Sequence, residues 1–308
     1  MRIGLIPMIK QKLGLGTVQF GLDYGISNGR GRVSEEQVGR ILALAASQGV
    51  TILDTASGYG DSEGVLGRAM PMGGQTFRIV TKLPVVIGNL VMPEDAQRVS
   101  MGLNASLQRL GLPSVYGLLA HHATDILKPD GRLLIRAMEK CRDVGWTRKI
   151  GVSVYHADEI DRILDLFTPD IVQLPISVAD QRLLHSGHLD RLKNLGVEIH
   201  ARSIFLQGLL LMAPEVLPDF FSPVRDHFSK IRAAFVEQGW SALEGCLRFA
   251  MERPELDVVL TGVAGVDELE EILAITTRCD GKDHGVNFPA VPDVYEDHLN
   301  PARWKIAQ

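Results

Sequence analysis

Eight short apolar runs, separated by longer amphipathic stretches, are the feature of this chain that most limits its fold. The stretches between the runs are long enough for crossover helices, so the alternation predicts parallel strands joined by helices. Eight is the number of strands that a closed barrel of the (β/α)8 type needs. We therefore predict an α/β fold, a (β/α)8 TIM barrel, with strands at residues 13–20, 50–54, 78–82, 115–121, 149–154, 170–175, 197–202 and 257–262.

Several helix starts can be recognised between these runs. Ser34 is followed three residues later by Gln37, as in a capping box, and the apolar residues after it lie on one helix face. A second helix begins at Pro93 and runs to Leu110, and residues 267–273 form the last crossover helix. A doubly wound open sheet is the alternative architecture, but no strand is followed by Gly-x-Gly-x-x-Gly and a later acidic residue.

The length and composition fit one domain that spans residues 1–308. The chain is 45% hydrophobic, and α/β barrels of about 250 residues commonly form a single unit. No linker rich in Pro, Gly or Ser divides the sequence. We expect residues 1–10 to form an N-terminal cap over the bottom of the barrel and residues 277–308 to form a C-terminal tail over its outside.

Charge and cysteine content argue against several other classes of protein. A net charge of −5 gives no basic surface for nucleic acid or a membrane, and Arg30 and Arg32 fit a solvated turn better than a phosphate clamp. Three scattered cysteines form neither a disulfide framework nor a metal site, so no metal is expected. Without a signal peptide or an apolar run of about 18 residues, the protein is expected to be soluble and cytoplasmic.

Four polar residues follow the ends of consecutive predicted strands: Asp54, Tyr59, Lys82 and His121. Parallel barrels carry their catalytic groups at these strand ends. A tyrosine can donate a proton near neutral pH if a cation lowers its pKa and a carboxylate holds that cation. His121 and His122 are neighbours, so in a strand only one of them could face the pocket, and we favour His121.

The motifs around these residues resemble those of the aldo-keto reductase family. The most specific run extends from Asp54 to Gly60, reads Asp-Thr-Ala-Ser-Gly-Tyr-Gly and is followed by spaced Ser-Glu and Leu-Gly pairs. The resemblance implies a barrel that binds a nicotinamide cofactor and transfers hydride to a carbonyl carbon. It continues in the family's order from about residue 12 to residue 276, through segments 13–17, 53–67, 81–82, 118–121, 150–154, 172–174, 201–208 and 261–271.

The resemblance implies a catalytic role for each of the four polar residues. Tyr59 would deliver the proton to the developing alkoxide, and Lys82, held by Asp54, would stabilise the tyrosinate. His121 would donate a hydrogen bond that orients the carbonyl oxygen. Two other functions stay open: a sugar-modifying epimerase or isomerase that uses the nicotinamide transiently, and a nucleotide-binding regulatory subunit.

Residues after several strands match the family's cofactor positions. Ser153 and Gln173 match residues that hold the nicotinamide carboxamide, although Val154 stands where asparagine is usual. Arg202 replaces the aromatic residue that stacks on the ring, so its flat guanidinium or Phe205 would cover the ring. The loop after the seventh strand would bind phosphate through backbone amides, unless it serves as an apolar lid. The other positions of this group are Gly16, Thr17, Ser203, Gln207 and Gly208.

The last motif bears on the choice between NADPH and NADH. Gly262 and Glu268 stand where NADPH users of the family carry a basic residue, and Ile272 stands where they carry an asparagine for the adenine. Glu268 would repel a 2′-phosphate but could accept a hydrogen bond from a ribose hydroxyl. The habit of the family slightly favours NADP(H), with NAD(H) as the alternative. Val263 and Glu271 complete the cofactor positions of this segment.

The substrate side of the pocket is predicted from the residues after the first strand. Gln19, Phe20 and Tyr24, together with His122 and residues 203–225, form a wall of polar and aromatic side chains. Such a wall suits a small polar or sugar-derived carbonyl compound. The substrate's identity and the oligomeric state cannot be predicted from these residues.

Overall fold

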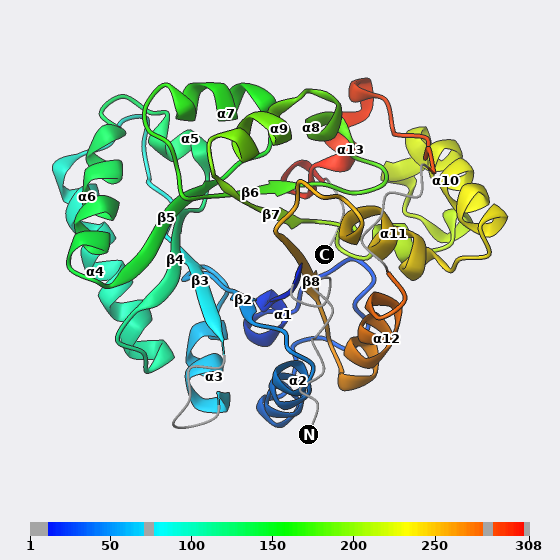
Figure 1. Ribbon diagram of the computed structural model, residues 1–308, viewed down its shortest axis with the longest axis horizontal. Helices are drawn as coiled ribbons and strands as arrows, with labels where there is room; N and C mark the ends of the chain where they lie inside the picture. Colours follow the sequence, from blue (N-terminus) through cyan, green and yellow to red (C-terminus); the bar gives the residue numbers. More distant parts are fainter. Residues whose placement is uncertain (1–11, 71–76, 280–285, 305–308) are drawn as a thin grey trace.

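The computed structural model describes residues 12–70, 77–279 and 286–304, which form a barrel surrounded by helices (Figure 1). All eight strands are parallel, each pairs with the next, and β8 closes on β1. The predicted TIM barrel is therefore confirmed, and the doubly wound sheet is excluded. The predicted cap at residues 1–10 lies outside the described residues. The strands are β1 (Leu13–Gly16), β2 (Ile52–Asp54), β3 (Arg78–Lys82), β4 (Val115–Ala120), β5 (Thr147–Ser153), β6 (Ile171–Pro175), β7 (Glu198–Arg202) and β8 (Val258–Gly262).

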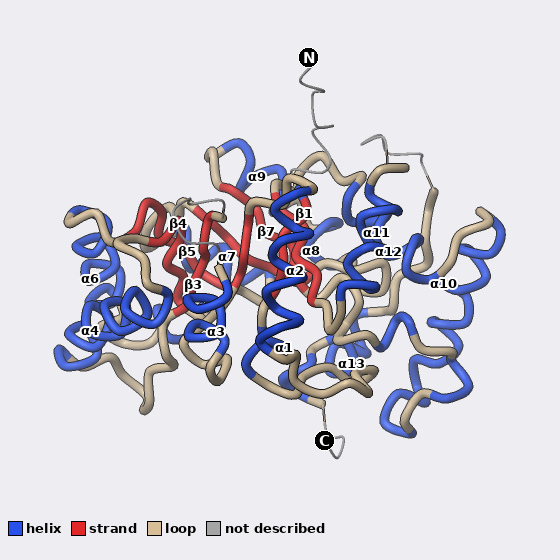
Figure 2. The backbone as a smooth tube through the Cα atoms, turned by 90° about the horizontal axis from the view of Figure 1, so that it is seen from below, coloured by secondary structure: helices blue, strands red, loops and turns tan. Residues whose placement is uncertain are grey.

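Helices cover the outside of the barrel, as Figures 1 and 2 show from two directions. The longer ones are α2 (Glu35–Ser47), α3 (Ser62–Ala69), α4 (Pro93–Leu110), α6 (Arg132–Asp143), α7 (Ala157–Leu164), α9 (His188–Asn194), α10 (Arg225–Glu237), α11 (Ala242–Met251) and α12 (Val266–Thr276). The remaining helical segments are short turns: α1 (Val18–Gly21), α5 (Ala123–Ile126), α8 (Arg182–His185), η2 (Leu209–Leu211), η3 (Pro214–Val216), η4 (Asp219–Val224), η5 (Asp293–Tyr295), α13 (Glu296–Leu299) and η6 (Pro301–Arg303).

The predicted helix starts are confirmed. The Ser34 hydroxyl accepts a hydrogen bond from the Gln37 backbone N–H at 3.4 Å and so caps α2. Helix α4 begins at Pro93 as predicted, and it ends before Gly111, whose φ of 65° suits glycine. The buried residues of both helices recur every three to four positions, which puts them on one face of each helix. This apolar face packs against the barrel.

The first predicted strand is too long at its C-terminal end. Residues 13–16 form β1, but Val18–Gly21 form α1 instead of continuing the strand to residue 20. Thr17 ends the strand because its N–H and its hydroxyl both donate to the Asp54 carbonyl oxygen, at 2.9 and 3.0 Å. Phe20 is 0% exposed on this short helix and belongs to the core, so its predicted place in the substrate pocket is wrong.

Layers of side chains fill the interior of the barrel. A polar layer closes its N-terminal end, where Tyr116 donates to Glu198 at 2.7 Å, His200 bonds to the same carboxylate at 2.7 Å, and Lys149 forms an ion pair with it. The packed interior leaves the functional site to the opposite end. Above the polar layer lies an apolar layer made of Ile52, Val80, Leu119, Ile171, Val258 and Leu260.

The C-terminal tail crosses the end of the barrel where the strands finish. Gln181 donates to the Phe288 carbonyl oxygen at 3.1 Å, and the Val291 N–H donates to the Ala179 carbonyl oxygen at 3.0 Å. Further along, Pro301 and Ala302 line a pocket that also contains the strand-end residues Asp54 and Gln173. The prediction that residues 277–308 lie over the outside of the barrel is therefore wrong for this part of the tail.

Candidate active site

Asp54 and Lys82 form a buried ion pair at the C-terminal ends of β2 and β3. The Lys82 ammonium lies 2.6 Å from Asp54 Oδ2 and also donates to the Thr55 carbonyl oxygen at 3.0 Å. Lys82 is only 2% exposed. Burial alone would lower the pKa of Lys82, but the charges of Asp54 and Tyr59 outweigh burial and raise it. Lys82 is therefore a charged, immobile cation at the base of the pocket.

Tyr59 and His121 lie beside this cation. Tyr59 follows β2 in a tight turn, and the Lys82 ammonium is 5.0 Å from the centre of its ring. His121 comes directly after β4, and its ring meets Tyr59 edge to face with 5.7 Å between ring centres. Gly60 has a φ of 57°, and a Cβ there would stand 2.5 Å from the Gly21 carbonyl oxygen. The turn that positions Tyr59 therefore requires glycine.

His121 is held in its neutral form. Burial, together with the nearby charges of Lys82, His122 and Arg202, lowers the pKa of His121 to about 3. A neutral imidazole can donate a hydrogen bond to a carbonyl oxygen without adding charge to the site.

Both histidines line the pocket, so the prediction that only one of them could face it is wrong. Strand β4 ends at Ala120, and His121 and His122 therefore lie beyond the alternating part of the chain. Their rings stack, with 4.8 Å between the centres and 9° between the planes.

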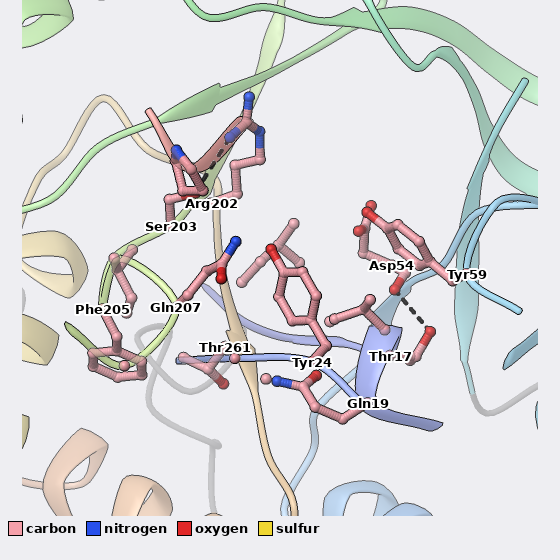
Figure 3. Close-up of a pocket in the computed structure, with 18 of the residues that line it drawn as sticks. Thr17, Gln19, Tyr24, Asp54, Tyr59, Arg202, Ser203, Phe205, Gln207 and Thr261 are labelled. Atoms are coloured by element: carbon pink, nitrogen blue, oxygen red, sulfur yellow. Dashed lines mark hydrogen bonds between the residues drawn. The ribbon is translucent and has the colours of Figure 1, made fainter. Parts of the chain in front are cut away.

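A cavity of about 610 Å³ lies above the four polar residues, and Figure 3 shows many of the side chains around it. Its volume is in the range of small-molecule and cofactor sites. Gln19 and Thr261 line this cavity, and their buried atoms Gln19 Oε1 and Thr261 Oγ1 have no hydrogen-bond partner among the described residues. Buried polar atoms usually have partners, so these two fit a polar ligand. Predicted site residues that line the cavity are Gly16, Thr17, Gln19, Tyr24, Asp54, Tyr59, His121, His122, Ser153, Gln173, Arg202, Ser203, Phe205, Gln207, Gly208, Gly262 and Glu268.

Ser153 and Gln173, the two residues matched to the carboxamide, are adjacent in the pairing of β5 with β6. Gln173 Nε2 donates to Asp54 Oδ1 at 2.7 Å, so the amide is tied to the ion pair below it. Both residues also line the cavity. Their placement fits a nicotinamide whose carboxamide lies at the strand ends, close to Tyr59.

The loop after β7 has an unusual backbone. Ser203, Leu206 and Gln207 have φ values of 61°, 46° and 55°, and Gly208 follows with 88°. Left-handed conformations are uncommon for residues other than glycine, and they often occur where a backbone must serve a ligand. At Gly208 a Cβ would stand 1.7 Å from Ser27 Oγ, so the loop also packs closely on the β1–α2 loop. Ser203 and Gln207 line the cavity, whereas Leu206 is buried in the core.

The segment after β8 carries an acidic group at the other end of the cavity. Glu268 Oε2 accepts a hydrogen bond from the Ala264 N–H at 2.8 Å and lines the cavity. Arg30 binds Asp267 with two hydrogen bonds of 2.9 and 2.7 Å, and its Nε is 3.8 Å from Glu268. Arg30 is thus an exposed, ion-paired residue that links the loop before α2 to the first turn of α12.

Three predicted cofactor residues lie outside the cavity. Val263 and Ile272 are 1% and 3% exposed and belong to the hydrophobic core. Glu271 is exposed on the outer side of α12 and does not line the cavity. Their predicted contacts with a cofactor are not supported: Val263 is buried just after β8, and α12 turns Ile272 towards the barrel and Glu271 away from it.

The Ser-Glu pair after Tyr59 supports the site from behind. Ser62 donates to the Thr17 carbonyl oxygen at 2.8 Å, which joins α3 to the end of β1. Glu63 is 2% exposed and accepts hydrogen bonds from Thr81 at 2.6 Å and from Arg109 at 2.6 and 2.8 Å. These residues hold the strand ends in place without lining the cavity.

Several lining residues were not predicted. Tyr155, Ser27, Asn28, Pro301 and Ala302 all border the cavity. Tyr155 stands two residues after Ser153, a position just beyond a strand end, and this could have identified it. Ser27 and Asn28 lie in the loop before α2, and Pro301 and Ala302 lie in the short turn η6 of the tail, whose course the sequence pattern does not reveal.

The described residues contain no cluster of His, Cys, Asp and Glu side chains that could hold a metal ion. None of the helices in this part of the chain combines the length and the apolar character that crossing a membrane requires.

Comparison with known proteins agrees with this site. The model of the aldo/keto reductase family matches residues 12–284. An aldo-keto reductase of Mycolicibacterium vanbaalenii is 28% identical over 284 residues, which are 88% of this chain and 92% of that protein. L-galactose dehydrogenase of Arabidopsis thaliana is 28% identical over 265 residues, 81% of each chain.

A solved structure shows the same fold. An aldo-keto reductase from Bacillus halodurans aligns with a TM-score of 0.69 and 20% identity, over 86% of both chains. Because the family model spans nearly the whole sequence, the chain belongs to the aldo-keto reductase family of NAD(P)H-dependent carbonyl oxidoreductases.

Proposed function

We propose that the protein reduces an aldehyde or a ketone to an alcohol, with Tyr59 as the proton donor. The observation that carries this proposal is the grouping of Tyr59, His121 and Asp54 on one cavity, with the buried Lys82 ammonium paired to Asp54 and 5.0 Å from the centre of the Tyr59 ring. A reduced nicotinamide bound in the cavity would supply hydride to the carbonyl carbon. The protein must then protonate the carbonyl oxygen, and Tyr59 is the phenol beside a fixed cation.

Each of the other residues has a role in that proton transfer. Lys82 stabilises the negative charge that Tyr59 acquires when it gives up its proton. Asp54 holds Lys82 in position through the 2.6 Å ion pair. Neutral His121 donates a hydrogen bond to the carbonyl oxygen and orients it between the imidazole and the phenol.

The cavity wall supports a polar substrate. Gln19, Tyr24, Asn28 and Arg202 place amides, a phenol and a guanidinium around the space next to Tyr59. These groups can bind several hydroxyls, as a sugar-derived carbonyl compound presents. A relative that matches most of the chain is named L-galactose dehydrogenase, which is consistent with a sugar-derived substrate.

The acidic residues after β8 support NADH over NADPH. Glu268 lines the cavity, and its carboxylate accepts a hydrogen bond from the Ala264 N–H just before α12. This N–H is therefore not free to bind a phosphate. Asp267 pairs with Arg30 and compensates its charge. A 2′-phosphate near these groups would meet a net negative charge, whereas a ribose hydroxyl could donate to Glu268.

The test is a panel of aldehydes, ketones and aldoses incubated with NADH or NADPH while absorbance is followed. Wild type should consume the cofactor, and Tyr59→Phe should lower turnover by about 10²–10⁴ while cofactor binding is retained. Tyr295→Phe, the same substitution at a tyrosine that does not line the cavity, serves as the matched control. Retention of a tenth or more of wild-type turnover by Tyr59→Phe would contradict the assignment.

The same panel separates the alternatives. An epimerase or isomerase would convert its sugar without net consumption of the cofactor. A regulatory subunit would bind the cofactor and reduce none of the carbonyl compounds.

A further inference from the structure

Among the described residues, Arg202 is a cation without a counterion, and it lines the cavity above Asp54 and Tyr59. No ion pair of Arg202 occurs among the described residues, and its guanidinium is held by neutral groups: a backbone carbonyl, a hydroxyl and an aromatic ring. Its Cζ lies 4.1 Å from the centre of the Tyr155 ring. Its two terminal nitrogens donate to the Val154 carbonyl oxygen at 3.1 Å and to Ser203 Oγ at 3.2 Å. The position of the charge is therefore fixed, and the charge itself is not neutralised.

The charge of Arg202 acts across the cavity. Arg202 ends β7 and pairs in register with Pro175 of β6, and Figure 3 shows it across the view from Tyr59. Burial and the charges of Lys82 and His122 lower the pKa of His121, beyond β4, and the charge of Arg202 contributes in the same direction. Burial raises the pKa of Tyr24 to about 12, and the positive charge of Arg202 acts against this rise. A nicotinamide ring bound between His121, Tyr24 and Arg202 would experience the same positive potential from Arg202.

We propose that Arg202, positioned by Tyr155, makes the cavity bind a reduced nicotinamide more tightly than an oxidised one. The inference rests on the proposed function, because it takes the bound ring to be the one that gives hydride to a carbonyl near Tyr59. When the ring loses hydride to the carbonyl carbon, it changes from neutral to positively charged. A neighbouring cation repels only the charged form.

This arrangement differs from an aromatic side chain at the same place. The face of an aromatic ring attracts a cation and would favour the oxidised form. Here the aromatic face of Tyr155 is directed to Arg202 instead. The consequence for turnover is that the oxidised product is held more weakly than the reduced reactant, so its release is promoted. Arg202 is thus a residue that sets the cofactor's redox-state preference, and Tyr155 is a positioning residue.

Isothermal titration calorimetry tests this preference without any turnover. Dissociation constants are measured for NADH and NAD⁺ and, in parallel, for NADPH and NADP⁺, at fixed ionic strength. Wild type should bind the reduced form more tightly. Arg202→Met should shift the ratio of the two constants towards the oxidised form by about tenfold, because one repulsive charge pair is removed. Arg202→Lys, which keeps the charge, and Tyr155→Phe, which keeps the ring, should retain most of the preference.

Three results would overturn the proposal. The first is that the wild-type protein binds the oxidised dinucleotide as tightly as the reduced one; this can be measured without making a variant. The ratio could be unchanged in Arg202→Met, or Arg202→Lys could behave like Arg202→Met, which would show that shape and not charge matters. Failure of wild type to bind any of the four dinucleotides would instead refute the proposed function.

Discussion

Replacing Lys82 with Met should abolish activity and destabilise the fold, and the two effects can be separated. The side chains of Lys82 and Asp54 are 1% and 7% exposed and lie 2.6 Å apart. In Lys82→Met, the Asp54 carboxylate stays buried and keeps only the Gln173 amide as a side-chain donor. A buried charge without its partner is costly because it has lost both water and its counterion.

The expected magnitude follows from this geometry. Breaking a buried ion pair by removing one partner typically costs ~3–5 kcal/mol, and the remaining bond from Gln173 places Lys82→Met near ~3 kcal/mol. Adding Asp54→Asn removes the stranded charge while it keeps the shape and an acceptor for Gln173. The double variant should therefore return to within ~1 kcal/mol of wild-type stability. It should stay inactive, since the cation beside Tyr59 is still missing.

Urea unfolding and turnover measurements on the same preparations decide the question. Lys193→Met is the matched control, because the Lys193–Asp257 pair has a similar distance of 2.7 Å but side chains that are 35% and 34% exposed. Its loss should cost ~1 kcal/mol or less and leave turnover unchanged. If Lys82→Met were as stable as wild type, or if the double variant were no more stable than Lys82→Met, the reasoning about the buried charge would be refuted.

Three further predictions concern other parts of the molecule. Burial alone would raise the pKa of Glu198, but hydrogen bonds from His200 and Lys149 lower it from 4.5 to about 2. The Glu198 carboxylate should therefore stabilise the fold by ~2–3 kcal/mol above pH 4.5, and this contribution should be lost as the pH falls towards 2. Urea unfolding of wild type and Glu198→Gln between pH 2 and 7 should show the two stabilities converge at the acidic end. Glu268→Arg should raise the affinity for NADPH relative to NADH by ~1–3 kcal/mol in calorimetric titrations, and an unchanged ratio would show that Glu268 does not face the ribose. Gly67→Ala should lower the free energy of unfolding by ~1 kcal/mol or more, and so lower the melting temperature, because its Cβ would stand 2.1 Å from a backbone oxygen of α4. Gly39→Ala is the control and should leave both unchanged, because a Cβ there meets no atom within 4 Å.

The strands and their order could be predicted from the sequence because each buried strand forms a short apolar run. The grouping of Asp54, Lys82 and His121 could be predicted for the same reason, since parallel strands bring their carboxyl ends together. The structure does place these residues at adjacent strand ends. Local patterns were sufficient wherever a side chain's position depends only on the strand that carries it.

Positions beyond the strand ends could not be predicted in this way. His122 and Phe20 were placed by extending strand alternation one or more residues too far, and the chain turns at both places. The family resemblance places Ile272 at the adenine, although the buried series that includes Leu269, Leu273 and Thr276 has the spacing of a helix face turned inward. For Ile272 the periodicity was the better guide.

We expect the two ends of the cavity to discriminate between cofactors by separate properties. Glu268 bonds to Ala264 and lies near Arg30, whereas Arg202 bonds to Val154 and Ser203, so the two sites share no direct partner in these contacts. Effects at sites without shared partners are expected to add. Glu268→Arg should therefore change the preference for the 2′-phosphate and leave the preference for the reduced ring, and Arg202→Met should do the reverse. A change of both preferences by either substitution would mean that the cofactor shifts as a whole, and that neither side chain acts on the group assigned to it.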